Sequence, residues 1–495
     1  MDDPEVKHIC LLNPQGNFDP DNSYWTKHPD FGGQLVYVKE LSLALAKKGV
    51  KVDIITRQIH DENWPEFSQK IDKYPESDKV RIIRVPFDGE KFLNKEDLWP
   101  YINEYVKGII EFYDNENSFP DLAISHYGTG GISGLLLKLK KNIPFIFTGH
   151  SLGAEKMEKL DINKFNFTEY NTKYNFHRRI IAERLSIKYS DGIVTSTNLE
   201  KDEIYKKSIY EDVIEENKFM ISPPGVNTNI FDGQYSKKTK ENLNKIFNRD
   251  LNENRIKLPF VLINSRLTKK KNHIKLIKAY VENVKLQNKA NLAISLRNVD
   301  NPFDDYSKLQ GEEKNILDQI MKLIYNNNCS DKVTMFSVDT QKDLAETYSY
   351  FAEKKSIFSL PSIYETFGLT LIEAIASGLP AVVTKNGGPA EVVQKGKYGI
   401  LIDPNDSENI AEELLSLLTD DKKWNELHKS GIEYIKDKYS WDNTANDYLK
   451  LIHKIITNKS EYNIDKYDIP DYYTVPDSKN DSRLLDRFLR IWKNS

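Results

Sequence analysis

Cysteine is nearly absent from this chain, since only Cys10 and Cys329 occur among its 495 residues. Two thiols so far apart provide neither a disulfide framework nor the paired cysteines of a zinc site. Long apolar runs are missing too, because no window approaches the roughly 18 apolar residues that a membrane-spanning helix needs. The acidic start of the chain is followed only by a short apolar run at residues 9–12, too short for a signal peptide. We therefore expect a cytoplasmic protein that does not enter a membrane.

An excess of either charge is also lacking. The formal net charge is -4, from 70 lysines and arginines against 74 aspartates and glutamates. This balance gives no basic field for nucleic acid or for an anionic membrane, so each basic residue is interpreted locally. The length of 495 residues exceeds what one hydrophobic core supports. We expect two or three domains and no nucleic-acid or membrane partner, while composition leaves the oligomeric state open.

Two cofactor motifs are missing. No Gly-x-Gly-x-x-Gly follows the first expected strand, which disfavours a nicotinamide enzyme. No Asp-x-Asp stands at the end of a strand, and the pairs Asp304-Asp305 and Asp420-Asp421 lie in polar stretches typical of solvated turns. We therefore expect neither a cofactor nor a metal.

Short apolar segments alternate with amphipathic helices along the whole chain, the pattern of parallel sheets covered on both faces. In the first half, strands are expected at residues 8–12, 52–56, 81–85, 122–125, 145–148, 192–195 and 219–222. In the second half, they are expected at residues 260–264, 292–296, 333–336, 357–360, 381–384 and 399–402. The sequence therefore predicts an α/β fold with two Rossmann-like, doubly wound parallel-sheet domains.

The border between the halves is expected near residues 233–255, which are polar and lysine-rich with only isolated apolar residues. The end of the chain contains two expected helices, at residues 443–456 and 482–492, joined by a polar segment with two prolines. We expect three parts, namely an N-terminal domain at 1–240, a C-terminal domain at 241–440 and a helical tail at 441–495 that crosses back to the N-terminal domain.

Two glutamates, Glu365 and Glu373, stand eight positions apart where an apolar strand ends and a helix is expected to begin near Gly368. This spacing places the first carboxylate at the mouth of the helix and the second two turns inside. Backbone N–H groups at such a mouth, together with the positive end of the helix dipole, suit hydroxyls and anions at the carboxyl edge of a parallel sheet. A sugar nucleotide offers both.

A glycoside hydrolase is the main alternative for this pair of carboxylates. Eight helical residues separate two backbones by ~12 Å, whereas hydrolases hold their two carboxyl groups within roughly 5 to 9.5 Å. The spacing therefore fits two ends of an elongated ligand better than one scissile bond. An N-terminal helix glutamate with an unrelated exposed one is the structural alternative.

Two loops carry candidate anion-binding groups. Gly32 and Gly33 open a helix after the first strand, and glycines there let the backbone approach a ligand, although such a pair is often only a turn. Arg266 leaves the end of a strand and Lys271 begins the next helix, so two cations can converge on a diphosphate. The run of three lysines ending at Lys271 is otherwise typical of a solvated face.

Histidine and arginine mark a further candidate region. His150 lies between two glycines at the carboxyl end of a strand, where ligands bind in such sheets, although a lone histidine is more often structural. Arg178 and Arg179 are neighbours on a helix, where successive side chains diverge by ~100°. At most one of the two is therefore expected to face a given anion.

Together these motifs resemble the sucrose-phosphate synthase group of retaining GT-B glycosyltransferases, and the resemblance runs through most of the chain. Glu365 and Glu373 match the Glu-x7-Glu element of that superfamily, while Arg266 and Lys271 match its diphosphate-binding pair. The resemblance implies a GT-B fold with two domains facing a cleft. It also implies donor-site roles, in which Glu373 accepts the ribose hydroxyls and Glu365 orients the hexose with the backbone of residues 367–369 (Phe367, Gly368 and Leu369). Gly33 is a further implied donor contact.

The first half of the chain distinguishes better among members of the superfamily. Its residues 32–34, 95–100, 148–153 and 178–183 look like those of sucrose-phosphate synthases. By this resemblance His150 contacts the donor glucose and shares the catalytic role with Arg266, Lys271 and Glu365. The residues implied to bind the acceptor are Gly33, Gln34, Lys95, Tyr127 and Ser151 for its fructose moiety, and Lys156 and Arg179, with Arg178 beside them, for its phosphate.

The implied reaction is transfer of glucose from UDP-glucose to fructose 6-phosphate with retained anomeric configuration, giving sucrose 6-phosphate and UDP. Several alternatives stay open. The related transferases are mannosylfructose-phosphate synthase and sucrose synthase, and the donor base and donor hexose are not fixed by the motifs. A sugar-nucleotide epimerase shares the architecture, and a non-catalytic sugar-phosphate sensor would bind without turnover.

Overall fold

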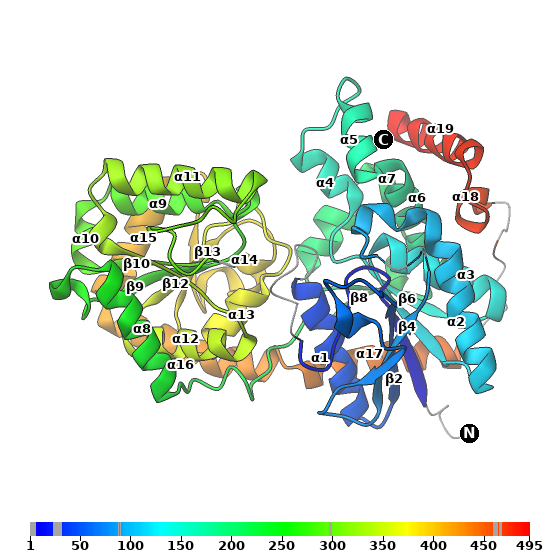
Figure 1. The fold of residues 1–495 in the computed structure, drawn as a ribbon, viewed down its shortest axis with the longest axis horizontal. Helices are drawn as coiled ribbons and strands as arrows, with labels where there is room; N and C mark the ends of the chain where they lie inside the picture. Colours follow the sequence, from blue (N-terminus) through cyan, green and yellow to red (C-terminus); the bar gives the residue numbers. More distant parts are fainter. Residues whose placement is uncertain are drawn as a thin grey trace. The chain divides into compact units, whose positions relative to one another are not determined.

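The computed structural model describes residues 6–22, 32–87, 89, 91–296, 299–458, 464 and 468–495. The chain forms two compact units, the first from Met1–Pro223 with Thr444–Ser495 and the second from Pro224–Asn443. Each unit has its own largely parallel sheet with helices against it (Figure 1). The predicted α/β architecture with two doubly wound halves is confirmed.

The first unit has an eight-stranded sheet in the order β3-β4-β2-β1-β5-β6-β7-β8. All pairs are parallel except β3 with β4. Its strands are β1 (His8–Leu12), β2 (Lys51–Arg57), β3 (Ile71–Lys73), β4 (Val80–Val85), β5 (Leu122–His126), β6 (Phe145–Thr148), β7 (Gly192–Thr195) and β8 (Phe219–Ile221). All seven predicted strands are present. The additional strand, β3, has three residues, no buried side chain and an edge position, so it leaves no apolar signal in the sequence.

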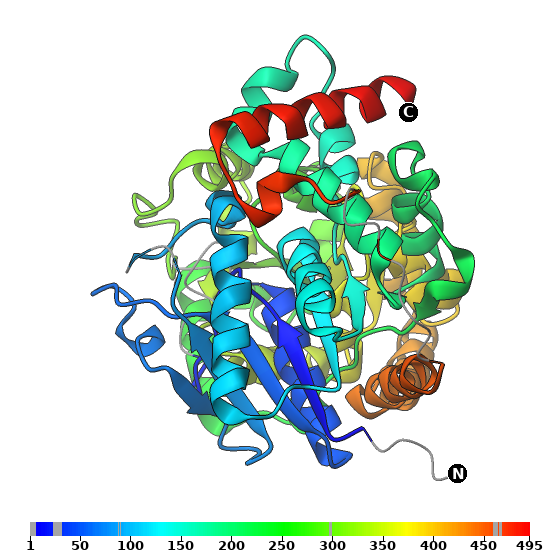
Figure 2. The same cartoon turned by 90° about the vertical axis from the view of Figure 1, so that its right-hand side faces the viewer.

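Helices of the first unit pack against this sheet and against one another. They are α1 (Gly33–Lys47), α2 (Ile102–Glu116), α3 (Tyr127–Lys141), α4 (Gly153–Lys159), α5 (Phe167–Tyr174), α6 (Phe176–Tyr189), α7 (Ser208–Glu211), the later part of α17 (Trp441–Thr457), α18 (Asp471–Thr474) and α19 (Ser478–Asn494). Helix α6 packs against α3 and α19. Figures 1 and 2 both show α19 beside α5 and α6, where Phe488 of α19 stacks on Phe167 of α5 with ring centroids 5.2 Å apart.

The second unit has a six-stranded, fully parallel sheet in the order β11-β10-β9-β12-β13-β14. Its strands are β9 (Phe260–Asn264), β10 (Asn291–Leu296), β11 (Val333–Ser337), β12 (Ile357–Leu360), β13 (Ala381–Thr384) and β14 (Ile400–Ile402). Each corresponds to a predicted strand. The central strand β9 is apolar on both faces, which is expected where helices cover both sides of a sheet.

Alternate residues of β9 enter two separate cores. Val261 and Ile263 pack with α9, α11 and α15, whereas Phe260 and Leu262 pack with α8, α12 and α13. The helices of this unit are α8 (Lys237–Asp250), α9 (His273–Val281), α10 (Val284–Lys289), α11 (Gly311–Asn326), α12 (Gln341–Glu353), α13 (Leu369–Ala376), α14 (Gly388–Val392), α15 (Ser407–Thr419), α16 (Asp421–Lys438) and the start of α17.

The predicted border at residues 240 and 241 differs from the border in the structure, which lies between Pro223 and Pro224. The polar segment that suggested the later border contains α8. Its apolar residues Leu243, Phe247 and Leu251 are buried in the second unit's core together with Phe231. The segment therefore belongs wholly to the second unit. At the other end, Thr444–Ser495 groups with the first unit, although α17 is continuous from Trp441 onward.

Both sheets reverse their order of construction beside their first strand. In the first unit the chain builds outward from β1 to β2 and β4, then returns to place β5 on the other side of β1. In the second unit β12 returns in the same way to the free side of β9. The loops that leave the carboxyl ends of strands at such switch points diverge, and ligands bind there in open α/β sheets.

Candidate functional site

Within the first unit, the loop after β1 leads to the start of α1 at Gly33. Gly33 is exposed, and the Gln34 side chain donates a hydrogen bond from Nε2 to Oδ1 of Asn13. Asn13 is fully buried and its backbone N–H donates to the carbonyl of Ile55 at 3.0 Å. The buried asparagine therefore orients Gln34 at the carboxyl end of β1.

Two aromatic residues at the neighbouring strand ends have strained backbones. Tyr127 follows β5 with φ 59°, and His150 follows β6 with φ 55°. Their rings lie with centroids 5.2 Å apart, and the ring of Tyr37 lies 5.1 Å from that of His150. Left-handed conformations of non-glycine residues are costly and cluster at functional sites. The strain supports a ligand-facing role for both residues.

His150 is paired with a second histidine that the sequence analysis did not single out. Nδ1 of His126 lies 2.9 Å from Nε2 of His150, and the rings stack with centroids 5.1 Å apart. Burial lowers the pKa of His150 to about 3. Burial also holds the pKa of His126 well below its usual value, and the neighbouring His150 lowers it further. Both rings are therefore neutral near pH 7. The N–H of one ring donates a hydrogen bond to the unprotonated nitrogen of the other.

Helix α17 contacts these strand ends through Tyr448. The hydroxyl of Tyr448 lies 2.9 Å from the hydroxyl of Tyr37 and 3.1 Å from Oγ1 of Thr148. All three side chains are buried. This network fixes the ring beside His150 and the last residue of β6, so the chain after Asn443 helps to hold the candidate site.

Arg179 and Ser151 meet beside the loop after β6. The Arg179 guanidinium donates from Nη2 to the Ser151 carbonyl at 2.8 Å and from Nε to Oε1 of Glu183 at 2.7 Å. Glu183 is fully buried and also accepts from the backbone N–H of Gly153 and from the Tyr210 hydroxyl. Its carboxylate therefore links α6 to the start of α4 and aims Arg179 at the Ser151 loop.

Lys156 lies on α4 in a region of excess positive charge. Its Nζ is 3.6 Å from Oε1 of Glu96, and it sits over the Tyr174 ring at 3.6 Å from the centroid. Burial, followed by the charges of Arg179 and Lys95, lowers the pKa of Lys156 to about 8, and Glu96 offsets only part of this effect. Three cations thus act on one another, and the carboxylates described beside them are Glu96, which faces Lys156, and Glu183, which pairs with Arg179. An anion bound there would relieve the repulsion.

Arg178 points elsewhere, as the divergence of neighbouring helical residues predicted. Its Nε and Nη2 donate to the two carboxylate oxygens of Asp481 on α19 at 2.8 and 3.0 Å. The guanidinium also lies over the ring of Tyr472, 5.1 Å from its centroid. The same carboxylate accepts a hydrogen bond from Nε2 of His177 at 2.8 Å. Arg178 therefore docks α19 onto α6, and the structure does not bring it to Lys156.

In the second unit, the loops after β9 and β12 are tied together. Lys271, the last residue of the short helical turn η7 (Lys269–Lys271), donates from Nζ to Oε2 of Glu365. The next residue, Asn272, has φ 59° and donates from Nδ2 to the carbonyls of Pro361 and Pro404 at 3.0 and 2.7 Å. Arg266 follows β9 and is exposed. The structure thus brings Lys271 and Glu365 together at the switch point between β9 and β12.

The loop carrying Glu365 depends on glycines, two of which the sequence analysis overlooked. Gly368 has φ 92° immediately before α13. Glu365 forms an isolated bridge with Gly387, where an added Cβ would lie 2.3 Å from the Glu365 carbonyl oxygen. At Gly388 it would lie 2.1 Å from the carbonyl oxygen of Thr366. The sequence Asn386-Gly-Gly-Pro at the end of an expected strand was the available signal.

Glu373 is buried, with 8% of its surface exposed, and is the fifth residue of α13. It is therefore one turn inside the helix rather than the predicted two, because the chain remains in a loop from Glu365 to Gly368. Phe367 is buried in the core of the unit and Leu369 packs against that core, so their backbone groups rather than their side chains are available to a ligand.

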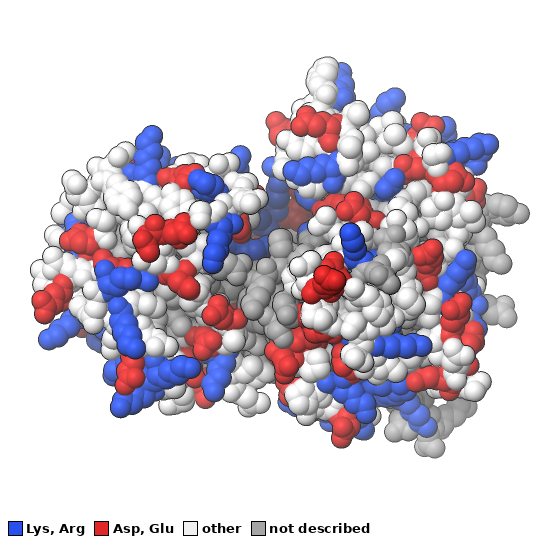
Figure 3. Space-filling view, in the orientation of Figure 1, with Lys and Arg blue, Asp and Glu red and all other residues white. Residues whose placement is uncertain are grey.

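No group of three or more potential metal ligands occurs among the residues that the structure describes. Within the same residues, no helix combines the length and apolar character required to cross a bilayer. Lysine and arginine alternate with aspartate and glutamate over the face drawn in Figure 3, without a large area of one sign. On this face, positive charge is therefore not gathered into one area.

Two family models match the chain. Residues 2–206 match the model described as sucrose synthase first GT-B domain, and residues 244–436 match glycosyl transferases group 1.

Relatives of known name agree with these matches. A probable sucrose-phosphate synthase of Thermosipho melanesiensis is 42% identical over 449 residues, which cover 90% of this chain and 96% of that protein. The sucrose-phosphate synthase of Spinacia oleracea is 30% identical over 503 residues, covering 90% of this chain and 47% of the plant protein. Among solved structures, the sucrose-phosphate synthase of Thermosynechococcus elongatus superposes with a TM-score of 0.71 at 22% identity, covering 92% of this chain and all of that one. The structural likeness supports a GT-B fold.

Replacing Glu183 by alanine is expected to destabilise the region around α6 by about 3–5 kcal/mol, because the partly buried Arg179 guanidinium loses the fully buried carboxylate that pairs with it at 2.7 Å. Hydrogen exchange of α4 and α6 amides measures this effect as loss of protection. The matched control is Glu96→Ala, whose carboxylate is partly exposed and lies 3.6 Å from its cation, and which should cost less than about 1 kcal/mol. Equal effects of the two substitutions would contradict the linking role of Glu183.

Proposed function

The chain belongs to the sucrose-phosphate synthase family of GT-B glycosyltransferases, and from this we propose that it transfers glucose from UDP-glucose to fructose 6-phosphate. The products are sucrose 6-phosphate and UDP, and the anomeric configuration of glucose is retained. The observation that carries the proposal is the group of cations formed by Lys156, Arg179 and Lys95. Their mutual repulsion, which helps to hold the pKa of Lys156 at about 8, suits a site completed by an anion.

Acceptor binding follows from this charge. The phosphate of fructose 6-phosphate carries close to two negative charges above its second pKa of about 6. Lys156 and Arg179 would bind it through charge-assisted hydrogen bonds. The fructose moiety would contact Gln34, Ser151 and Tyr127, three residues that leave the carboxyl ends of β1, β6 and β5.

Donor binding is assigned to the second unit. Arg266 and Lys271 would bind the diphosphate, and Glu365, now paired with Lys271, would accept hydrogen bonds from hexose hydroxyls. Glu373 would accept the ribose hydroxyls. Neutral His150 would contact the glucose as a hydrogen-bonding group rather than as a cation.

Transfer with retention requires no protein base. The bond between glucose C1 and the diphosphate oxygen breaks, and the bond between C1 and the acceptor C2 hydroxyl oxygen forms on the same face. The hydroxyl proton passes to the departing diphosphate oxygen. Arg266 and Lys271 would stabilise the negative charge that grows on that oxygen, the electrostatic effect that usually dominates such catalysis. No metal or cofactor enters this scheme.

Incubation with UDP-glucose and fructose 6-phosphate in excess EDTA is expected to give sucrose 6-phosphate, identified by NMR together with its α-glucosyl configuration. A reaction that stops in EDTA and resumes with magnesium would contradict the metal-free scheme. Parallel reactions with ADP-glucose and GDP-mannose test the donor, and faster transfer from either would replace UDP-glucose in the proposal. Conversion of donor without acceptor would favour an epimerase.

Lys156→Ala and Arg179→Ala are each expected to lower kcat/KM for fructose 6-phosphate about 10- to 150-fold, since a hydrogen bond to a charged group contributes roughly 1.5–3 kcal/mol. Any slow reaction with unphosphorylated fructose should change little, and donor KM should stay constant. The matched control is Lys173→Ala, an exposed lysine on α5, which should behave like wild type. Equal losses on both acceptors would mean that the two cations support the fold or the donor site instead.

The pH profile of kcat/KM should fall above about pH 8, because deprotonated Lys156 no longer attracts the acceptor phosphate and this parameter reports the free enzyme. Below about pH 6 it should fall as the phosphate loses its second charge. Lys156→Arg keeps the charge at all these pH values, so the fall above pH 8 should disappear. An unchanged fall in that variant would assign it to another group.

A further inference from the structure

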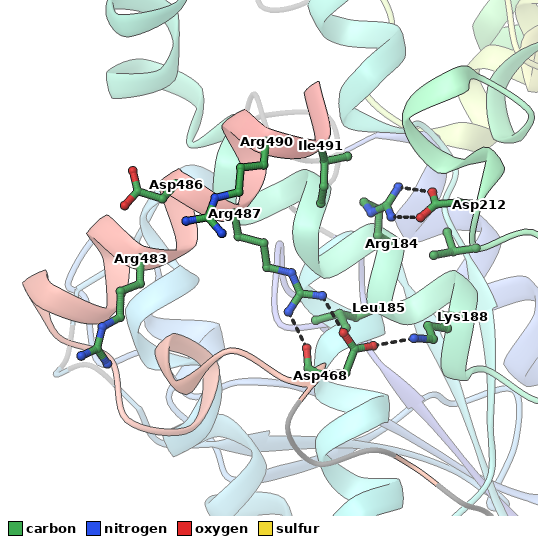
Figure 4. A pocket seen from close by; sticks show the side chains of 11 residues that line it. Arg184, Leu185, Lys188, Asp212, Asp468, Arg483, Asp486, Arg487, Arg490 and Ile491 are labelled. Carbon is green, nitrogen blue, oxygen red and sulfur yellow. Dashed lines mark hydrogen bonds and ion pairs between the residues drawn. The ribbon is translucent and has the colours of Figure 1, made fainter. Parts of the chain in front are cut away.

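A pocket of about 570 Å³ lies between α6 and α19 in the first unit, away from the groups assigned to the substrates (Figure 4). Its wall on α6 includes Arg184 and Lys188, and its wall on α19 includes Arg487 and Arg490. Along α6, Arg184 and Lys188 are five and nine residues beyond Arg179, which corresponds to about 7.5 and 13 Å, and none of the cation group lines the pocket. The pocket is therefore distinct from the cation group around Lys156.

The lining is strongly charged, with five basic and three acidic side chains. The basic ones are Arg184, Lys188, Arg483, Arg487 and Arg490, and the acidic ones are Asp212, Asp468 and Asp486. The excess positive charge of the lining matches a small dianion. The volume falls within the roughly 300–1,000 Å³ typical of small-molecule sites.

Ion pairs hold part of this lining in place. Asp468 accepts from Lys188 Nζ and from Arg487 Nη2, each at 2.7 Å, and Arg184 pairs with Asp212 through hydrogen bonds of 2.6 and 2.5 Å. Burial raises the pKa of Asp468, but its hydrogen bonds from Lys188, Tyr189 and Arg487 outweigh this and hold the pKa at about 2. Asp468 thus remains charged and bridges α6 to α19 across the pocket.

Two arginines of the lining are not held in this way. Figure 4 draws no interaction for Arg490 with the other lining residues, and within the described part of the chain it has no hydrogen bond or ion pair. Arg483 has one weak ion pair there, with Asp471 at 3.9 Å. Arg487 and Arg490 are three residues apart on α19, so they lie on one face of the helix. This face offers guanidinium groups that are pre-positioned and incompletely neutralised.

We propose that this pocket binds a small phosphate dianion, either free phosphate or a phosphomonoester, through Arg490 and the outer nitrogens of Arg487, with Lys188 opposite them. Arginine is suited to this ligand because its planar fork of donors matches phosphate oxygens. A ligand held by both helices would also tighten the docking of α19 on α6. That docking already depends at its other end on Asp481, which binds Arg178.

The test measures hydrogen exchange of the α19 amides in the full chain, with inorganic phosphate or glycerol 3-phosphate against sodium chloride at equal ionic strength. Phosphate at about ten times its dissociation constant should slow exchange about tenfold. Arg490→Gln should remove this protection without loosening α19 in the absence of phosphate. Lys493→Gln, on the same helix but outside the pocket lining, is the matched control and should keep the protection. A larger effect of glycerol 3-phosphate would identify the ester as the preferred source.

Phosphate can also bind at the proposed acceptor site, so the experiment is repeated in Lys156→Ala. Protection of α19 that persists there and disappears in Arg490→Gln supports the pocket. Protection that survives Arg490→Gln, or that chloride reproduces, would overturn it. Protection lost in Lys156→Ala alone would also overturn it, because the anion would then act at the acceptor site. The readout does not depend on catalysis, so failure to form sucrose 6-phosphate would leave this test intact.

Discussion

The structure depends on one geometric constraint, that parallel strands all end at the same edge of a sheet. Each unit returns to its first strand midway through construction, so the loops after β1 and β5, and those after β9 and β12, leave from neighbouring strands. These loops and their immediate neighbours carry Gln34, Tyr127, His150, Lys271 and Glu365. Within each unit, residues far apart in sequence are thus brought to the same edge of the sheet without any specific pairing code between them.

Carboxylates, fully buried at Glu183 and partly buried at Asp481 and Glu365, then determine where each cation points. Arg178 and Arg179 are consecutive, yet Glu183 directs Arg179 to the Ser151 loop while Asp481 directs Arg178 to α19. In the second unit, Glu365 similarly engages Lys271. A carboxylate in low dielectric fixes its partner strongly, because an unpaired buried charge is costly. The division of roles on α6 therefore follows from which acid faces each arginine.

The sequence predicted the regular alternation of strands and helices. It missed features that are set by contacts between distant parts of the chain. All thirteen expected strands were found because they are largely apolar runs, whereas β3 has one apolar and two charged residues at an exposed edge. The border was displaced because Leu243 and Phe247 look isolated until α8 places them on one face. His126 was missed since nothing in the sequence shows that its ring stacks on His150. The depth of Glu373 was overestimated because its turns were counted from Glu365, whereas α13 begins at Leu369.

Helix α6 connects the proposed acceptor site with the pocket. One end of the helix bears Arg179, which is assigned to the acceptor, and the other bears Arg184 and Lys188 of the pocket. Helix α19 is tied to both ends of α6. Asp481 of α19 binds Arg178 in the first turn of α6, and Arg487 of α19 binds Asp468, which also accepts from Lys188 in the last turn of α6. A hydrogen-bonded helix transmits a shift along its axis better than a loop does, because its backbone has few soft degrees of freedom. The last helix of the chain is thus part of the mechanical support of the acceptor group, although it contributes no residue to the proposed chemistry.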